Sequence, residues 1–367
     1  MSVHKFTLPI ADVFPGMLAA EEINILNKYG ASVMHVKLGT PLSDEILRRL
    51  ARHKVTEVVV AHKNALIIET PPVKPILDEA VREKAVDNIR DLFGAIGDSE
   101  NMTTAYHAVK ELDDVVDQLV DSLTSETESF VHIADLKSFD EYTYHHSLSV
   151  AVLSIAIGTG IGLSTSQLKK LGQCAILHDI GKTQVPIEIL NKPGRLTDEE
   201  FEIIKEHAEK SGEYLARLGI GDQELWSAVS HHHEKLDGSG YPSGLAGDDI
   251  PLYSKIISIA DVYDAVTSYR PYRKPMAPSE AIEIIMSEIG RSFEYRLVKI
   301  FVDKLDLYPP NSVVQLTDGR QGIVVDNTDS VMRPVLKMLE DGSEIDLMGL
   351  DNLSLIIEKV VDGFEDN

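Results

Sequence analysis

Residues 177–182 read LHDIGK, in which an apolar helix end is followed by His178, Asp179 and the helix-breaking Gly181. An imidazole and a carboxylate at the end of a core helix are costly to bury unless they are paired or bound to a cation. The segment therefore predicts a polar site inside a helical core. Other histidines and aspartates of the chain indicate what completes that site.

The histidines are concentrated in one part of the chain. Seven of the thirteen fall within residues 145–233. A helix expected to begin near residue 223 carries Leu225 and Val229 on its apolar face, and His232 and His233 fall on the next turn of that face. Two imidazoles that continue a buried stripe must satisfy their nitrogens in the core or bind a ligand.

The helix expected to begin at Thr197 repeats this pattern. Thr197 and Glu200 form a capping box, which marks a helix N-terminus. Phe201 and Ile204 then define an inner face, and His207 follows on the same face. A third helix therefore directs an imidazole toward the interior.

Two further predicted helices place polar side chains on apolar faces. Asp261 replaces an apolar residue on the core face of the helix after residue 251, and Asp264 follows one turn later. His146 shares a face with apolar residues at positions 150, 153 and 157. His145 and His231 point elsewhere and are the weaker candidates.

Separate helices thus direct histidines and aspartates toward one interior. Borderline divalent metals bind imidazole and carboxylate together, and two ions could share this many ligands and lower the pKa of a water between them. A polar core satisfied by its own hydrogen bonds is the alternative. We favour metal binding.

The formal charge of -24 argues against binding to duplex DNA or RNA through a broad basic surface. A small phosphate-bearing ligand is still compatible with it, since metal ions and a few Lys or Arg side chains make a local positive site. Cys174 is the one cysteine, which suits a reducing compartment. An apolar content of 43% supports substantial cores.

Residues 147–168 lack Asp, Glu, Lys and Arg, but Gly158, Gly160 and Gly162 interrupt the stretch. The continuous apolar run is too short for a membrane span, so we expect a buried helix followed by a turn. The N-terminus lacks the layout of a signal peptide. The sequence predicts a soluble, cytoplasmic protein.

The hydrophobic period changes along the chain. Strand-like runs surround one helix that begins near Ser43, helical patterns dominate the middle, and short strands with glycine-containing turns return near the C-terminus. We predict a mainly α fold in four parts: a small α/β module (1–70), a helical linker region (71–130), an all-helical domain (131–307) and a small β-rich segment (308–367).

Five segments resemble the HD-GYP phosphodiesterases of bacteria, which belong to the HD superfamily. They are YTYHHS (142–147), LHDIGK (177–182), KPGRLTDEEF (192–201), HHEKLDGSGYP (232–242) and IADVYDAVTSYRPYR (259–273). Their order and spacing cover about half the chain. The resemblance implies an HD-type catalytic domain that hydrolyses cyclic di-GMP or a related cyclic dinucleotide with a metal-activated water. The products would be the linear dinucleotide and, with further hydrolysis, GMP.

The resemblance also implies roles for individual residues. One divalent ion would be bound by His146, His178, Asp179 and Asp261. Asp179 would bridge to a second ion bound by His207, His232 and His233. Iron or manganese is the expected metal, with nickel and zinc as alternatives.

Some members of the family hold a third metal with a glutamate four residues before the first histidine ligand. Tyr142 occupies that position here, which favours two metals, although Glu141 lies beside it.

Four residues are expected to act on the substrate. Lys182 follows the helix-breaking glycine and would reach the phosphate or the leaving oxygen. Arg270 and Arg273 suit bidentate phosphate contacts. Tyr241, in the GYP loop, would contact a guanine base or the phosphate. Ordinary solvated side chains are the alternative for all four.

Two other functions remain open on the sequence alone. One is an HD hydrolase of another nucleotide, and the other is a receptor or scaffold that binds the dinucleotide without turnover. Expected partners are the cyclic dinucleotide, a GGDEF-domain protein and a second copy of the chain. The sequence identifies neither the metal nor the choice between cyclic di-GMP and a mixed dinucleotide.

Overall fold

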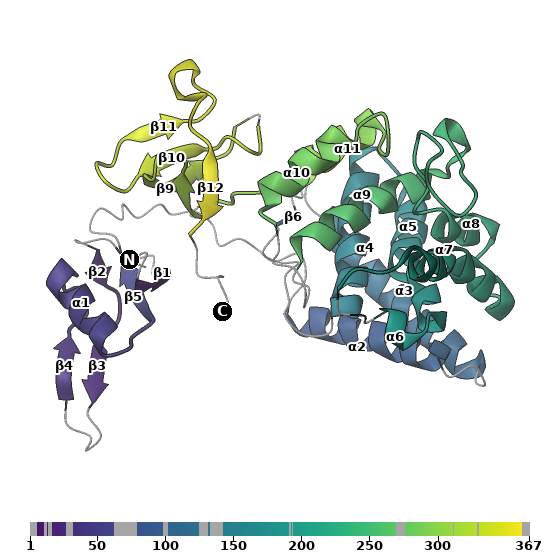
Figure 1. The fold of residues 1–367 in the computed structure, drawn as a ribbon, viewed down its shortest axis with the longest axis horizontal. Coiled ribbons are helices and arrows are strands. Elements are labelled where there is room, and N and C mark those ends of the chain that lie inside the picture. The colour runs from purple at the N-terminus through teal and green to yellow at the C-terminus, as the bar shows by residue number, and fades with distance from the viewer. Residues whose placement is uncertain are drawn as a thin grey trace. The chain divides into compact units, whose positions relative to one another are not determined.

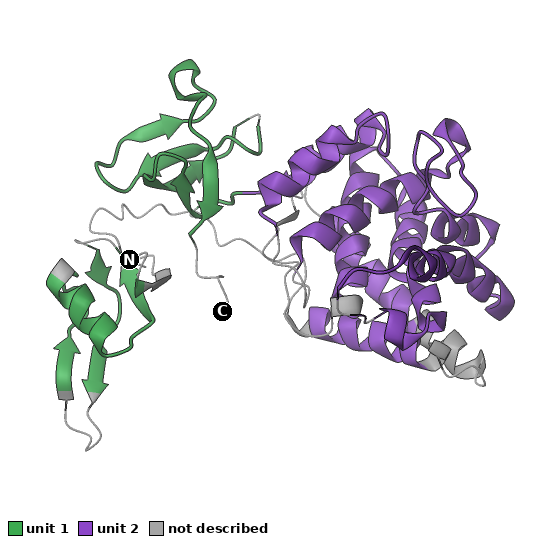
Figure 2. Ribbon diagram, viewed as in Figure 1, with its two compact units in different colours: residues 1–73, 308–367 green, residues 74–307 purple. Residues whose placement is uncertain are grey.

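The computed structural model describes residues 6–10, 13, 17–26, 32–61, 79–97, 102–124, 131–132, 142–190, 192, 194–268, 276–310, 312–328 and 330–361. The chain divides into two compact units, residues 1–73 with 308–367 and residues 74–307 (Figure 2). The mainly α fold with an N-terminal α/β part and a C-terminal strand region is confirmed. The four-part boundaries remain a prediction.

The helical unit is built around α4 (Tyr142–Gly160), the buried helix expected from the uncharged stretch. It packs against α2, α3, α5, α9 and α11 (Figure 1). The other helices are α2 (Glu79–Gly97), α3 (Met102–Thr124), α5 (Thr165–Leu177), η3 (Ile180–Gln184), α6 (Ile187–Leu190), α7 (Asp198–Leu218), α8 (Gln223–Ser230), η4 (Gly247–Asp249), α9 (Leu252–Thr267), α10 (Pro278–Ser287) and α11 (Tyr295–Lys304). A short parallel pair, β6 (Val131–His132) and β7 (Leu305–Asp306), joins distant parts of this unit.

Capping side chains mark the helix starts, as predicted for Thr197 and Glu200 and found also at Asp222. The side chains of Thr197 and Glu200 cap α7 reciprocally, and the Asp222 carboxylate accepts a hydrogen bond from the Leu225 amide at the start of α8. Each side chain satisfies a backbone donor that has no partner inside its helix. Capping therefore places the first turn of two helices that carry or precede functional histidines.

The second unit combines strands from both ends of the chain. Its N-terminal elements are β1 (Phe6–Pro9), β2 (Leu18–Ala19), β3 (Ile23–Leu26), β4 (Ser32–Val36), α1 (Asp44–Arg52) and β5 (Glu57–Ala61). Its C-terminal elements are β8 (Val313–Leu316), β9 (Gln321–Asp326), β10 (Val335–Met338), β11 (Glu344–Asp346), η5 (Leu350–Asn352) and β12 (Ile357–Val360). Ser43 caps α1 as predicted.

Antiparallel pairing builds three sheets in this unit, ordered β1-β5-β2, β3-β4 and β11-β10-β9-β8-β12. One hydrophobic cluster contains Val58 and Val60 of β5 together with Val313, Ile323 and Val361. The two ends of the chain therefore contribute to the same core.

Two expectations about the helical unit are wrong. The helix predicted to reach residue 233 ends at Ser230, so His232 and His233 lie in the turn that follows. Phe201, expected on an inner face, is 47% exposed, because the buried residues of α7 begin only at His207. None of the described helices combines the length and apolarity that a membrane crossing requires.

Two glycines allow close contact between the segments that carry the histidines. A Cβ atom at Gly181 would clash with the carbonyl oxygen of His207 and lie 2.7 Å from the amide nitrogen of Ser211. A Cβ atom at Gly212 would clash with the Ser230 hydroxyl. Because η3 meets the α7 backbone directly, the segment carrying Asp179 approaches His207 without intervening side chains.

Replacement of Gly181 by alanine tests this contact. We expect Gly181→Ala to lower the free energy of unfolding by about 1–3 kcal/mol, since the clashing atoms belong to backbone and cannot rotate away. Urea denaturation measures the change. The control is Gly94→Ala on α2, where an added Cβ meets nothing within 4 Å. That variant should be as stable as the wild type or slightly more stable, and equal stability of the Gly181 variant would show that the contact is absent.

Candidate metal centre

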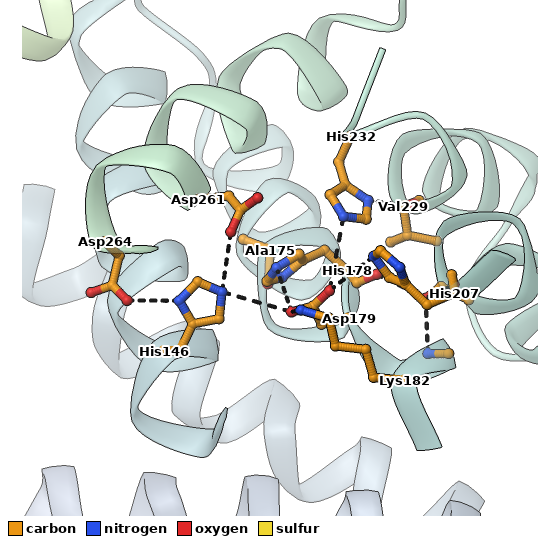
Figure 3. Close-up of polar contacts among 12 residues, drawn as sticks. His146, Ala175, His178, Asp179, Lys182, His207, Val229, His232, Asp261 and Asp264 are labelled. Carbon is orange, nitrogen blue, oxygen red and sulfur yellow. Dashed lines mark hydrogen bonds and ion pairs between the residues drawn. The ribbon is translucent and has the colours of Figure 1, made fainter. Parts of the chain in front are cut away.

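All seven side chains predicted to bind metal converge in the helical unit. Figure 3 labels each of them except His233. They come from five segments of the chain: α4, the end of α5, α7, the turn after α8, and α9. The residues are His146, His178, Asp179, His207, His232, His233 and Asp261. Six of these are buried, and the His233 side chain is 25% exposed.

Asp179 lies at the middle of the cluster. Its Oδ1 is 3.2 Å from Nε2 of His207 and 3.9 Å from Nε2 of His232. Its Oδ2 is 3.3 Å from Nε2 of His178 and 3.7 Å from Nε2 of His146. One carboxylate thus faces four imidazole nitrogens from four different segments.

Backbone hydrogen bonds determine which nitrogen of each ring faces Asp179. His178, His207 and His232 each donate from Nδ1 to the carbonyl oxygen three residues earlier, at 2.6 Å. A carbonyl only accepts, so Nδ1 carries the proton and Nε2 of the neutral ring presents a lone pair. This arrangement of an imidazole held by a carbonyl is typical of metal ligands.

Four of the facing atoms lack hydrogen-bond partners among the described residues. Among the residues that the structure describes, Nε2 of His178, His207 and His232 and Oδ1 of Asp179 are buried without one. Lone pairs and a carboxylate oxygen repel one another unless a proton or a cation lies between them. A divalent cation that prefers imidazole and carboxylate satisfies all four atoms, so the residues fit the metal that the sequence predicts.

The electrostatics keep the imidazoles of His232 and His233 neutral. Burial and the neighbouring imidazoles hold the pKa of His232 well below its usual value. Burial and His207 lower the pKa of His233 to about 3, although Asp261 and Asp179 oppose that change. Neutral imidazole is the form that binds metal.

The carboxylates, by contrast, stay ionised. Burial raises the pKa of Asp179, but the effects of His178 and Lys182 are opposite and together larger. The pKa therefore lies well below its usual value. The pKa of Asp261 is also lowered despite burial, chiefly by its hydrogen bond with His146. The neutral imidazoles of His232 and His233 and the ionised carboxylates of Asp179 and Asp261 are donors suited to a cation.

Asp264 belongs to this centre, although we did not predict a role for it. Its Oδ2 lies 2.6 Å from Nδ1 of His146, while Nε2 of that ring lies 3.2 Å from Oδ1 of Asp261. Burial lowers the pKa of His146, but the two carboxylates raise it to about 9. Asp264 orients the His146 ring as the backbone carbonyls orient the other three. Its position one turn after Asp261 was the available signal.

Lys182 is placed at the edge of the cluster. Its ammonium contacts Oδ2 of Asp179, and its side chain is 28% exposed. The Lys182 side chain therefore contacts the buried carboxylate and is also accessible to solvent. This position agrees with the predicted contact to a phosphate but does not test it.

The GYP loop closes over the exposed side of His233. The Tyr241 ring lies 4.7 Å from the His233 ring, and the Tyr241 amide donates to the His233 carbonyl at 3.2 Å. Gly240 permits this approach, because a Cβ there would lie 2.5 Å from the Glu234 Cα. The buried Glu234 carboxylate, which sequence reasoning missed, accepts from the Ser243 amide at 2.7 Å and holds the loop.

Several sequence predictions fall outside this description. Arg270, Arg273 and Glu141 lie outside the described residues, and the side chain of Tyr142 is not described. His231 donates to the Ser227 carbonyl at 2.8 Å and takes no part in the metal-binding groups.

Among the described residues, the ligand atoms form three groups, two of which share Asp179. One group joins Asp179 to His207, His232 and His233, and a second joins it to His146 and His178. Within each group the ligand atoms lie within 4.8 Å of one another. The third group joins His178, His232 and Asp261, so the groups overlap and the two-ion assignment implied by the family resemblance stays a prediction.

Comparison with known families agrees with this geometry. The model of the HD domain family matches residues 128–297, the segment that contains every residue of the cluster. Over this segment the chain is therefore similar to the HD domain family.

The relatives of the chain are cyclic-dinucleotide phosphodiesterases. A cyclic di-GMP phosphodiesterase of Pseudomonas aeruginosa is 37% identical over 226 residues, which cover 61% of this chain and 54% of that protein. The 3'3'-cGAMP-specific phosphodiesterase 1 of Vibrio cholerae is 39% identical over 171 residues, covering 47% and 39%. A cyclic di-GMP phosphodiesterase of Thermotoga maritima is 39% identical over 164 residues, covering 44% and 45%. The chain thus spans about half or less of these relatives.

Asp264→Asn tests the orienting role of this carboxylate. We expect metal affinity to fall by about 10–100-fold, because an amide no longer fixes the His146 ring and its proton. Competition with a chelator measures the affinity. Asp248→Asn, at a fully exposed position, serves as the control. Unchanged affinity in the Asp264 variant would exclude the orienting role.

Proposed function

We propose that this protein is a metal-dependent phosphodiesterase that hydrolyses cyclic di-GMP or a related cyclic dinucleotide. The observation that carries the proposal is the buried Asp179 carboxylate faced by imidazole nitrogens whose tautomers are set by backbone carbonyls. The names of the relatives supply the substrate class.

The metal centre would hold two divalent ions. On the family resemblance, His146, His178, Asp179 and Asp261 would bind one, and His207, His232 and His233 would bind the other together with Asp179. Iron or manganese suits this mixture of imidazole and carboxylate, as do nickel and zinc. Such ions supply an activated water and neutralise charge on the phosphate when they are bound.

The chain's own residues prepare the site for an anionic substrate. Asp264 holds the proton on Nδ1 of His146, and the low pKa of Asp179 keeps its carboxylate ionised. Lys182 would balance charge on the phosphate or the leaving oxygen, since its ammonium lies beside Asp179 and is accessible from solvent. Tyr241 would close the substrate side of the site over His233.

A mixed guanine–adenine dinucleotide is the second candidate substrate, because one of the relatives is specific for 3'3'-cGAMP. A GGDEF-domain protein and a second copy of the chain are proposed as partners on the family resemblance alone. A receptor that binds without turnover, or a hydrolase of another nucleotide, would give different outcomes in the experiment below.

The direct experiment combines elemental analysis with a timed product assay on metal-loaded protein. We expect linear dinucleotide to appear, and Asp179→Ala to remove both metal and turnover because the shared ligand is lost. Asp303→Ala, at an exposed position on α11, should retain both. Full activity of the Asp179 variant would contradict a metal mechanism. Binding without product would favour the receptor.

A second prediction concerns the phosphate-binding arginines. Arg270→Ala should weaken substrate affinity more than it changes metal content, because a guanidinium contacts phosphate bidentately while metal is held elsewhere. The KM for cyclic di-GMP and the metal-to-protein ratio are the two measurements. An unchanged KM would count against the role of Arg270.

A further inference from the structure

An aromatic and cationic surface extends from the metal centre along α7. The Tyr241 ring lies 4.7 Å from the His233 ring, and the Lys205 ammonium lies 5.6 Å from the centre of the Tyr241 ring. The same ammonium lies 5.4 Å from the centre of the Phe201 ring. Successive contacts therefore lead from a predicted metal ligand to an exposed phenylalanine.

The exposure of Phe201 matters because its ring is linked through Lys205 and Tyr241 to His233 at the metal centre. A single exposed apolar side chain is ordinary on a protein surface. Phe201, however, is 47% exposed and shares the ammonium of Lys205 with the tyrosine of the GYP loop. The ammonium also lies 2.5 Å from the Glu202 carboxylate, and the Lys205 side chain is 25% exposed.

These groups are suited to a purine base. Aromatic side chains stack on nucleobases, and stacking tolerates any base because each has a π-face. Lysine donates to O6 and N7 of guanine, whereas adenine presents an amino group in place of O6. The aromatic groups would therefore provide affinity and the lysine would favour guanine.

We propose that Phe201, Lys205 and Tyr241 form a purine-binding shelf beside the metal centre, and that Lys205 favours guanine over adenine. This inference rests on the proposed phosphodiesterase function. A dinucleotide joins each phosphate to a base through one ribose. A phosphate at the metal centre would consequently place a neighbouring base over the shelf.

Phe201→Ala tests the stacking group. We expect the KM for cyclic di-GMP to rise by about tenfold, the size of one lost base–aromatic stack, with kcat and metal content unchanged. Phe201→Trp should retain the wild-type KM, because an indole ring also stacks. Met286→Ala removes a comparably exposed apolar side chain from α10 and should leave KM unchanged. An unchanged KM in Phe201→Ala overturns the shelf.

Lys205→Met tests the base preference. The ratio of the KM for cyclic di-AMP to that for cyclic di-GMP should fall by about tenfold, the lower part of the range for one lost base contact. Loss of affinity for both substrates in equal proportion would assign Lys205 to the phosphate and overturn its role in base preference.

Binding to metal-free protein separates the shelf from the catalytic proposal. We expect the dissociation constant of cyclic di-GMP, measured by calorimetry, to be about tenfold higher for Phe201→Ala than for the wild type. Equal constants, or no binding by the wild type, overturn the shelf. Absence of turnover by metal-loaded wild type would instead overturn the phosphodiesterase proposal. If Phe201→Ala changes the sedimentation coefficient but not affinity, the exposed ring belongs to a contact between copies, which also overturns the shelf.

Discussion

The arrangement of the helical unit depends on the burial of one carboxylate among imidazole lone pairs. Asp179 is almost completely buried, and its oxygens face Nε2 atoms of four histidines. Burying this charge is unfavourable unless cations or donors compensate it. Lys182 provides one such compensation, and bound metal would provide the larger one. The helices that meet here must therefore hold their polar groups accurately. Small displacements would bring the carboxylate oxygens and the imidazole lone pairs into unfavourable contact.

Two simple devices achieve that accuracy. A histidine within a helix or just after its end can donate from Nδ1 to the carbonyl three residues earlier. This hydrogen bond sets the tautomer and the direction of the ring without another side chain. Gly181 and Gly212 then allow the backbones of neighbouring segments to touch. The first device orients the ligands, and the second brings the segments that carry them within reach of one carboxylate.

The sequence predicted the features that depend on local pattern. Helical periodicity identified His146, His207 and Asp261, and capping residues located the start of α7. The sequence did not predict the pairing of Asp264 with His146. The two residues are 118 positions apart, and only the packing of α9 on α4 brings them together.

The exposure of Phe201 was missed for a related reason. Periodicity reports the face of a helix but not how far the neighbouring helices extend along it. The structure shows that the burial of α7 begins at His207. Long-range packing therefore limits what a local pattern can predict, for the orienting carboxylate and for the exposed ring alike.

The contribution of both chain ends to one core has a consequence for synthesis on the ribosome. Val58 and Val60 emerge early, but Val313, Ile323 and Val361 of the same hydrophobic cluster are made only after the whole helical unit. Domains generally fold as units while the chain is elongated, so the helical unit can form before that cluster is complete. Until then the apolar side chains of the N-terminal strands lack part of their core. The N-terminal strands therefore need protection from aggregation while the chain is being made.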